Sequence, residues 1–398
     1  MRPDILVPSH GDVIRDPSRC CDLLRRRLNE VYKAYSEVSA LRFYYPQLFA
    51  SAEGRKIYAK TAPAPDSLFH LGTSWGILSE GHAFLMDCGS PQVIKDLENM
   101  ISEGTLKDIE GLWITHTHDD HVDAVPEFLS RFPCPVYTDD SVAQVVEDPL
   151  AWRIPCVSPA QINVDRRIRD GETWTWRGWK MTGFHFPGQT EYHSGLLAEG
   201  QGQRLFFAGD SFTPSGMDDY CILNRNFAGE NVGFAQCVKK IRELKPDWIF
   251  NCHVNEGFHF TDEDCDLMLD NLKRREKLFA QISAWEDPNA GMDENWLRVA
   301  PYERKVQPGT SSEFDLFVTW HKPGRHEIRF SLIWPEGGPS QGQETKEIVE
   351  TGSERGIRFS VEIPATAPLG RMVVPVDVTW DHRRLGPLTE LVLVVSSP

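Results

Sequence analysis

The sequence has no apolar run long enough to cross a membrane. Its first eight residues are too few and too polar for a secretory signal peptide. Its nine cysteines are odd in number and lack the spacing of a disulfide framework, so we expect free thiols in a reducing compartment. These absences predict a cytoplasmic protein that no membrane segment anchors.

A surplus of basic residues is also missing. The chain has 42 Lys and Arg against 58 Asp and Glu, which gives a net charge of −16. Nucleic-acid binders usually carry a basic face, so this balance argues against nucleic acid as a partner. We expect a small-molecule substrate instead, and assembly into a homo-oligomer is compatible with the sequence. The 398 residues are enough for two domains.

The most informative stretch is residues 114–121, which read Ile-Thr-His-Thr-His-Asp-Asp-His. It places His116, His118, Asp120 and His121 within six positions. A tight turn after a strand can aim the first two at one metal ion and the last two at a second. Neutral imidazole and carboxylate suit zinc, iron or manganese. The alternative is a histidine cluster on the surface.

Four more polar residues stand where a strand-like run or a Pro-Gly turn gives way to a loop. They are Asp87, His193, Asp210 and His253. Together with the histidine block they form an ordered set over about 170 residues, which is far more specific than a single short motif.

This set resembles the signature of the metallo-β-lactamase superfamily, whose metal block reads H-x-H-x-D-H. The resemblance implies an α/β fold, an αββα sandwich, and two divalent metal ions, most readily zinc, with iron or manganese as alternatives. It also implies which residues bind each ion: His116, His118 and His193 the first; Asp120, His121 and His253 the second; Asp210 both.

The resemblance further implies a hydrolytic mechanism in which Asp120 and Asp210 are catalytic. A water shared by two metal ions loses its proton near neutral pH, and the resulting bridging hydroxide attacks a carbonyl or phosphoryl centre. Asp87 is expected to orient a ligand of the metal loop. Its alternative role is to form the turn before Gly89.

We expect an ester, thioester, lactone or related acyl substrate, because the block resembles the glyoxalase II-like and lactonase branches. A phosphodiesterase is the first alternative. A di-iron redox protein is a weaker one, since such relatives carry a glutamate where His118 stands and a flavin domain. A vestigial site in a binding protein is the weakest, because all seven metal-binding positions are occupied.

Substrate recognition is expected from loops around the site, above all residues 211–231. There Asn224 and Arg225 are candidates for an anionic substrate group, unless the loop is only surface. Tyr192 and His259 lie near ligands in the sequence and are candidate proton donors to a leaving group, although packing is the commoner role for such residues.

Two residues depart from the pattern of the superfamily. Asp123 stands where many relatives have glycine, and Gln189 replaces a common histidine that is not a ligand. Two cysteines, Cys88 and Cys252, adjoin motif residues, and we interpret both as buried packing residues.

The sequence divides into three parts: a helical segment over residues 1–50, a metallo-β-lactamase-like domain over 51–286, and a β-sandwich over 296–398. The opening stretch around His10 resembles the last motif of the superfamily. It is either the remnant of an upstream similar domain, lost by truncation, or a simple turn histidine.

Hydrophobic periodicity predicts helices over 91–102, 229–244 and 261–284, and a helix start at Asp16. Strands are expected over 67–78 and 82–87 as a pair, over 112–115, and through the tryptophans of 174–181. The C-terminal part alternates in five short runs with almost no helix signal: 314–320, 328–332, 357–363, 372–379 and 388–395. Their size and spacing are typical of a small all-β, immunoglobulin-like sandwich.

Overall fold

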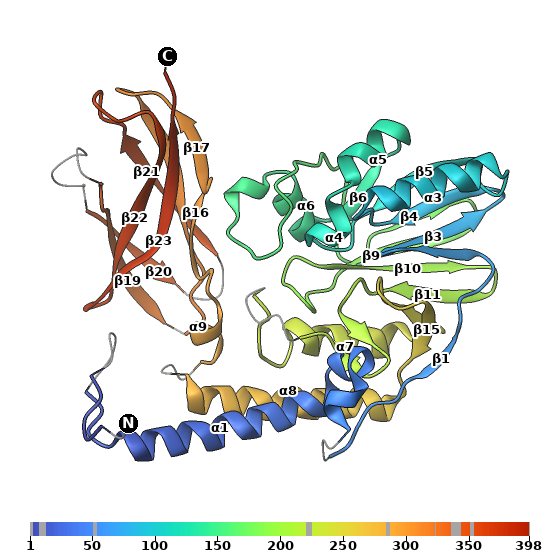
Figure 1. Cartoon of the computed structure of the whole chain (residues 1–398), viewed down its shortest axis with the longest axis horizontal. Coiled ribbons are helices and arrows are strands. Elements are labelled where there is room, and N and C mark those ends of the chain that lie inside the picture. The colour runs from blue at the N-terminus through green and yellow to red at the C-terminus, as the bar shows by residue number, and fades with distance from the viewer. Residues whose placement is uncertain are drawn as a thin grey trace.

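A computed structural model describes residues 3–7, 13–50, 54–219, 225–283, 287–322, 324–335, 344–350 and 354–397. It shows a layered α/β unit beside a separate β-sandwich at the C-terminal end of the chain (Figure 1). His10 and Asn224 lie outside the described residues.

The first sheet of the α/β unit has six strands. In spatial order they are β2 (Leu68–Leu71), β3 (Ser74–Ser79), β4 (His82–Met86), β5 (Asp108–Trp113), β6 (Val136–Asp139) and β7 (Arg166–Ile168). The strands from β4 to β7 are parallel, and β2, β3 and β4 form an antiparallel meander.

The second sheet has seven strands. In spatial order they are β1 (Lys60–Pro63), β15 (Glu256–His259), β14 (Trp248–Phe250), β11 (Gln203–Phe207), β10 (Ser194–Gly200), β9 (Trp179–His185) and β8 (Thr173–Trp176). Only β11 and β14 pair in parallel; the other neighbours are antiparallel.

The two sheets pack face to face, and alternation along the strands explains why. In β4, Phe84 points into the core between the sheets while Leu85 points out toward the helices; in β11, Phe207 and Phe206 divide in the same way. Helices cover both outer faces: α3 (Pro91–Ser102), α5 (Val125–Arg131) and α6 (Asp140–Val146) on the first sheet, α7 (Gly233–Leu244) and α8 (Asp262–Ile282) on the second. The predicted αββα sandwich is confirmed.

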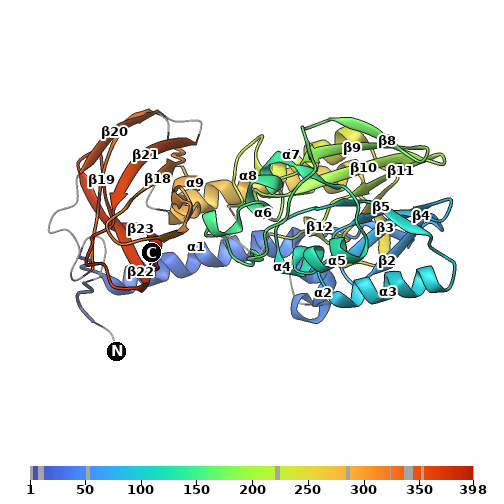
Figure 2. The same ribbon diagram turned by 90° about the horizontal axis from the view of Figure 1, so that it is seen from above.

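The N-terminal helix α1 (Pro17–Val38) runs beside α8 along the bottom of the molecule, and the view from above shows it reaching from the β-sandwich to the α/β unit (Figures 1 and 2). Asp16 accepts a hydrogen bond from the backbone N–H of Arg19 (3.1 Å), as expected of a helix cap. Thr261 and Asp264 form a capping box at the start of α8.

The C-terminal unit is a sandwich of two sheets around one apolar core. The smaller sheet orders β16 (Leu297–Ala300), β18 (Ser311–Val318) and β21 (Arg355–Glu362). The larger orders β17 (Glu303–Val306), β23 (Arg383–Val395), β22 (Gly370–Trp380), β19 (Arg325–Leu332) and β20 (Thr345–Glu350). Each of the five predicted runs coincides with one of these strands, although 314–320 and 357–363 extend past the ends of β18 and β21; β16, β17 and β20 were not predicted.

Two predicted strands are hairpins instead. Residues 67–78 contain β2, a turn at Gly72 and β3, while the tryptophan run contains β8, a turn at Arg177 and Gly178, and β9. Gly72, Arg177 and Gly178 have positive φ, the conformation that reverses the chain in a tight hairpin. Alternation continues through such a turn, so periodicity alone reads the hairpin as one strand.

Short elements complete the described chain: α2 (Leu41–Tyr44), α4 (Asp119–Val122), α9 (Asn289–Met292), the 3-10 turns Pro46–Phe49 and Pro149–Ala151, and the hairpin of β12 (Phe212–Thr213) with β13 (Gly216–Met217). Among the helices described, none combines the length and the apolar character that a membrane crossing needs.

Candidate metal centre

The residues of the histidine block and the later motifs converge at one edge of the two sheets. Thr115 and His116 follow β5, and His193 immediately precedes β10. Asp210 follows β11, and His253 follows β14. Because each motif ends or begins a strand at the same edge, residues more than a hundred positions apart meet there.

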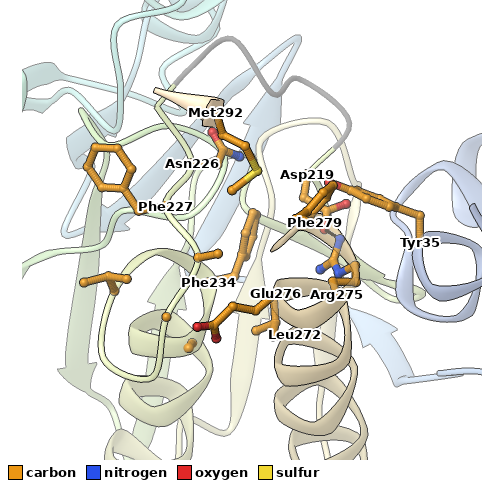
Figure 3. Close-up of a pocket in the computed structure, with 14 residues that line it drawn as sticks. Tyr35, Asp219, Asn226, Phe227, Phe234, Leu272, Arg275, Glu276, Phe279 and Met292 are labelled. Atoms are coloured by element: carbon orange, nitrogen blue, oxygen red, sulfur yellow. Dashed lines mark hydrogen bonds and ion pairs between the residues drawn. The ribbon is translucent and has the colours of Figure 1, made fainter. Parts of the chain in front are cut away.

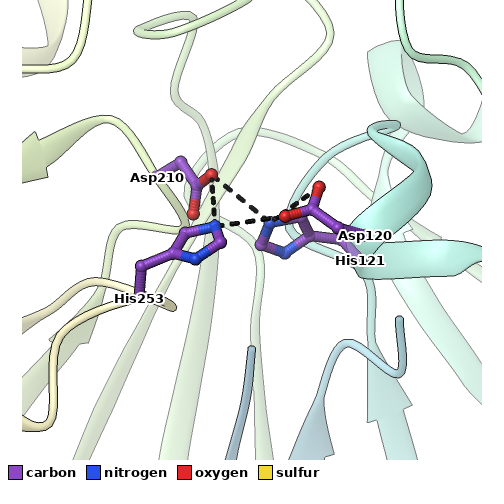
Figure 4. A group of neighbouring side chains, drawn as sticks. All are labelled: Asp120, His121, Asp210 and His253. Carbon is purple, nitrogen blue, oxygen red and sulfur yellow. Dashed lines mark hydrogen bonds and ion pairs between the residues drawn. The ribbon is translucent and has the colours of Figure 1, made fainter. Parts of the chain in front are cut away.

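One group consists of Asp120, His121, Asp210 and His253, whose ligand atoms all lie within 4.8 Å of one another (Figure 4). His253 Nε2 is 3.2 Å from Asp120 Oδ2 and 3.1 Å from Asp210 Oδ2. His121 Nε2 is 3.3 Å from the same Asp210 oxygen. Two imidazoles and two carboxylates in this space make a cation site by their chemistry.

A second group consists of His116, His118 and Asp210. His116 Nε2 lies 3.9 Å from Asp210 Oδ2, and the two histidine rings meet edge to face, 4.6 Å between centroids. The ring of His193 stacks on His116 at 4.7 Å, although its nitrogens fall outside the 4.8 Å group. Asp210 therefore belongs to both groups.

The donor atoms fit divalent metal ions. Within the described chain, His116 Nε2, His121 Nε2, His193 Nδ1 and Asp210 Oδ1 are buried without a hydrogen-bond partner. A buried polar atom left unpaired costs free energy, so four in one place indicate that a ligand pairs with them. Metal ions bound by these nitrogens and this carboxylate would satisfy all four.

The charges of Asp210, His193 and His116 suit metal ligation as well. Burial would raise the pKa of Asp210, but His121 and His253 hold it well below its ordinary value, so the carboxylate is ionised. Burial lowers the pKa of His193 to about 3 and that of His116 well below its ordinary value. Both imidazoles are therefore neutral, the form that binds metal.

Asp87 is the hydrogen-bonding centre behind this cluster. Its Oδ1 accepts from the backbone N–H of Thr115 (2.7 Å), and its Oδ2 accepts from the Thr115 hydroxyl (2.6 Å). Oδ2 also lies 2.9 Å from His121 Nδ1 and accepts from Cys252 Sγ (3.4 Å). The ring of His121 is thereby turned so that Nε2 faces Asp210. Cys252 is buried, as we expected, but contacts Asp87 in addition to packing; Cys88 is buried too.

Two glycines allow the backbone to pass close to the ligands. A Cβ at Gly89 would lie 1.6 Å from the backbone oxygen of Asp120. A Cβ at Gly209 would lie 2.6 Å from the ring of His193, and its φ of 51° is one that glycine tolerates best.

Several residues around the cluster were not singled out from the sequence. Ser211 Oγ lies 3.3 Å from His193 Nε2, and Asn251 Oδ1 accepts from the backbone N–H of His253 (2.6 Å). Gln189, noted only as a departure, donates from Nε2 to Asp210 Oδ2 (3.4 Å). The available signal was a polar residue placed just beyond the end of a predicted strand. Asp123, the other departure, is exposed at the end of α4.

The candidate substrate residues lie apart from the two ligand groups. Arg225 is buried against Asp293 and Tyr192. Tyr192 itself is 2% exposed. His259 lies in β15, where its Nδ1 is 3.2 Å from the backbone oxygen of Pro246.

Asn226, next to Arg225, lines a cavity of about 50 Å³ between α7 and α8 (Figure 3). The cavity also contacts the Arg275–Asp219 ion pair, and Arg275 lies over the ring of Tyr35. A space of this size holds a few water molecules rather than a substrate.

Fold and site together define a metal-binding αββα domain. Residues 69–253 match the sequence profile of the metallo-β-lactamase superfamily. The family implies divalent metal ions, typically zinc.

Two curated relatives match part of the chain. The chain is 26% identical over 146 residues to a hydroxyacylglutathione hydrolase of Bdellovibrio bacteriovorus, covering 36% of this chain and 49% of the relative. It is 23% identical over 179 residues to the hydroxyacylglutathione hydrolase of Aeromonas hydrophila, covering 45% and 59%. The matches thus span only about half of each relative.

Solved structures of metallo-β-lactamases are also similar. One from Elizabethkingia meningoseptica is 18% identical, with a TM-score of 0.41, over 56% of this chain and 92% of that one. One from Cronobacter sakazakii is 16% identical, with a TM-score of 0.41, over 56% and 98%.

Proposed function

We propose that this chain is a metal-dependent hydrolase that cleaves a thioester or a related acyl bond. The observation that carries the proposal is the meeting of two ligand groups at one buried carboxylate, Asp210. Two divalent ions, zinc by preference, would be bound there: one by His116, His118 and His193, the other by Asp120, His121 and His253. Hydroxyacylglutathione, named in the curated relatives, is a thioester, which supports this class of substrate.

Bound ions of this kind supply Lewis acidity and lower the pKa of a water molecule. The residues of the chain provide the surroundings for that chemistry. The side chains of Asp120 and His253 are 49% and 35% exposed, whereas His116 and His193 are fully buried. The cluster is therefore open on the side of Asp120 and His253, where a substrate can enter, and closed to water behind.

The ionised Asp210 orients its neighbours and carries negative charge that offsets the ions. Asp87 holds the ring of His121 through its Nδ1, which leaves Nε2 directed at the site. Asp210 and Asp87 therefore set the orientation of the ligand side chains around the site.

The test is metal analysis of the purified full-length protein, followed by assays on a panel of thioesters, lactones, esters and phosphodiesters. We expect about two metal ions per chain and hydrolysis that a chelator abolishes. Asp210→Asn should lose both metal and activity. Asp123→Asn, an exposed aspartate beside the same loop, is the matched control and should retain both.

A wild-type chain that binds no metal, or that hydrolyses the panel equally well after the metal is removed, would contradict the proposal. Metal-dependent cleavage of phosphodiesters alone would replace the acyl substrate by a phosphoryl one.

A further inference from the structure

We infer that the C-terminal β-sandwich positions the loops of the metal site, and that the ion pair of Arg225 with Asp293 is the contact through which it does so. Arg225 Nε is 3.0 Å from Asp293 Oδ1, and Nη2 is 3.2 Å from Oδ2. The side chains are 6% and 0% exposed. This two-point geometry fixes direction as well as distance, which a single charge contact does not.

On the side of the metal domain, the guanidinium of Arg225 reaches the segment that carries a metal ligand. Its Nη1 donates to the hydroxyl of Tyr192 (2.5 Å). Tyr192 is buried and immediately precedes His193, whose ring stacks on His116. A shift of Arg225 therefore moves the chain at His193.

Asp293 lies between α9 and β16, and the sandwich fixes its carboxylate. Its Oδ2 lies 2.8 Å from Nε2 of His321, which follows β18. Its Oδ1 accepts from the backbone N–H of Asn295, just before β16. The His321 ring in turn packs on Phe227, 4.9 Å between centroids.

A second line of contacts runs from the sandwich to the other side of the metal loop. Arg298, in β16, pairs with Glu354 (2.6 Å) and lies over the ring of Trp152 at 4.0 Å. The loop that begins at Trp152 continues to Val157, which forms a β-bridge with His118. The sandwich thus reaches the loop of His193 through Arg225 and the loop of His118 through Trp152.

The energetics favour a positioning role over a purely stabilising one. Removing two charges from water costs as much free energy as their attraction returns, so a buried ion pair adds little net stability over apolar residues. Losing one partner, however, leaves a buried charge unpaired and is strongly destabilising. Such a pair therefore enforces one arrangement of the two units, which is what two metal-site loops require.

Amide hydrogen exchange on the full-length chain tests this inference without any substrate. One amide reports on each of the two segments. In 225–232, the N–H of Ala228 donates to Asn289 Oδ1 (2.7 Å). In 187–195, the N–H of Ser194 donates to the backbone oxygen of Thr115 (2.7 Å). We expect Asp293→Asn to raise exchange about ten-fold in peptides covering 187–195 and 225–232, and to leave peptides of α3 unchanged.

Glu390→Gln is the matched control. Glu390 pairs with Arg153 (2.9 Å) between the same two units, but Arg153 is 52% exposed. Loss of this exposed pair should leave exchange in the peptides 187–195 and 225–232 unchanged. Tyr192→Phe is the second variant; it removes the hydroxyl that Arg225 contacts, keeps the ring, and should raise exchange in 187–195 alone.

The inference is overturned if Asp293→Asn leaves exchange unchanged in both 187–195 and 225–232, or raises exchange only within the sandwich. If Asp293→Asn unfolds the whole chain, Tyr192→Phe decides: a local rise supports the inference, and no rise overturns it. Because exchange is read without turnover, a chain inactive on the whole substrate panel would contradict the proposed function and leave this result intact.

Discussion

At the scale of single residues, the absence of a side chain at Gly89 lets its backbone pack against the metal loop. A side chain there would collide with backbone, the oxygen of Asp120 at 1.6 Å, and backbone in a closed loop cannot move aside. We predict that Gly89→Ala costs about 3 kcal/mol of unfolding free energy and lowers metal content. Urea unfolding and metal analysis measure both.

Gly104→Ala is the control for that change. Gly104 has φ of 77° and nothing within 4 Å of its added Cβ, so the substitution meets backbone strain without a collision. We expect a cost of about 1 kcal/mol and full metal content. Equal metal loss in the two variants would show that the contact with Asp120 is not the cause.

A second residue-scale prediction concerns His185, at the end of β9. Burial lowers its pKa, but the carboxylates of Asp139, at 3.3 Å, and Glu191, at 3.7 Å, outweigh this and raise the pKa to about 10. Folding therefore favours the protonated ring. The stabilisation is complete below the unfolded pKa of about 6.5 and is lost as the pH rises through about 10.

We predict that the metal-free chain loses about 2 kcal/mol more unfolding free energy between pH 6.5 and 10 than the His185→Gln variant does. Urea unfolding in chelator at the two pH values measures this difference. Parallel pH profiles for the two proteins would exclude His185 as the source.

At the scale of elements, α1 is built into the α/β unit. Val31, Ala34 and Val38 are buried, and Asn271 of α8 donates from Nδ2 to the backbone oxygen of Ala34 (2.8 Å). A Cβ at Gly216, in β13, would lie 2.0 Å from the backbone oxygen of Val38. The N-terminal segment is thus fitted to its neighbours on two sides.

We predict that Asn271→Ala destabilises the chain by about 1–2 kcal/mol, because it removes the hydrogen bonds from Asn271 Nδ2 to the Ala34 carbonyl and to Glu37 Oε2. Lys273→Ala, on the exposed face of α8, should change stability by less than about 0.5 kcal/mol. Thermal unfolding of both variants is the measurement, and equal effects would mean that the α1–α8 hydrogen bond contributes nothing.

The helices and strands differ in how well the sequence alone predicts them. The helix over 91–102 was predicted with its observed bounds, because Pro91 and the spacing of Val93, Ile94 and Leu97 mark it locally. The helix expected from 229 begins only at Gly233. Hairpin turns within 67–78 and 174–181 were missed, since a reversal of direction leaves alternation intact.

The same contrast holds within the site. Motif order named the members of both ligand groups, because the chemistry of metal ligands restricts residue type. It did not show that Arg225 is buried between Tyr192 and Asp293. These contacts join residues 33 and 68 positions apart, the second pair across the two units, and no local pattern records such a pairing.

At the scale of the whole molecule, metal binding is expected to stabilise the chain. Ions that bind only the folded state add free energy that grows with their concentration, about 4 kcal/mol at a thousand times the dissociation constant. We predict that a chelator lowers the unfolding free energy of the wild type by about this amount. Asp210→Asn should show little further loss in chelator, and an unchanged wild type would contradict the prediction.

The buried pair between the two units also has a consequence for descent. A recombination event that exchanged the β-sandwich, together with the segment that carries Asp293, for another module would leave the buried cation of Arg225 without its partner. Inheritance of the two modules is therefore expected to be joint, and a functional chimera would need Arg225 and Asp293 to be transplanted, or replaced, as a pair.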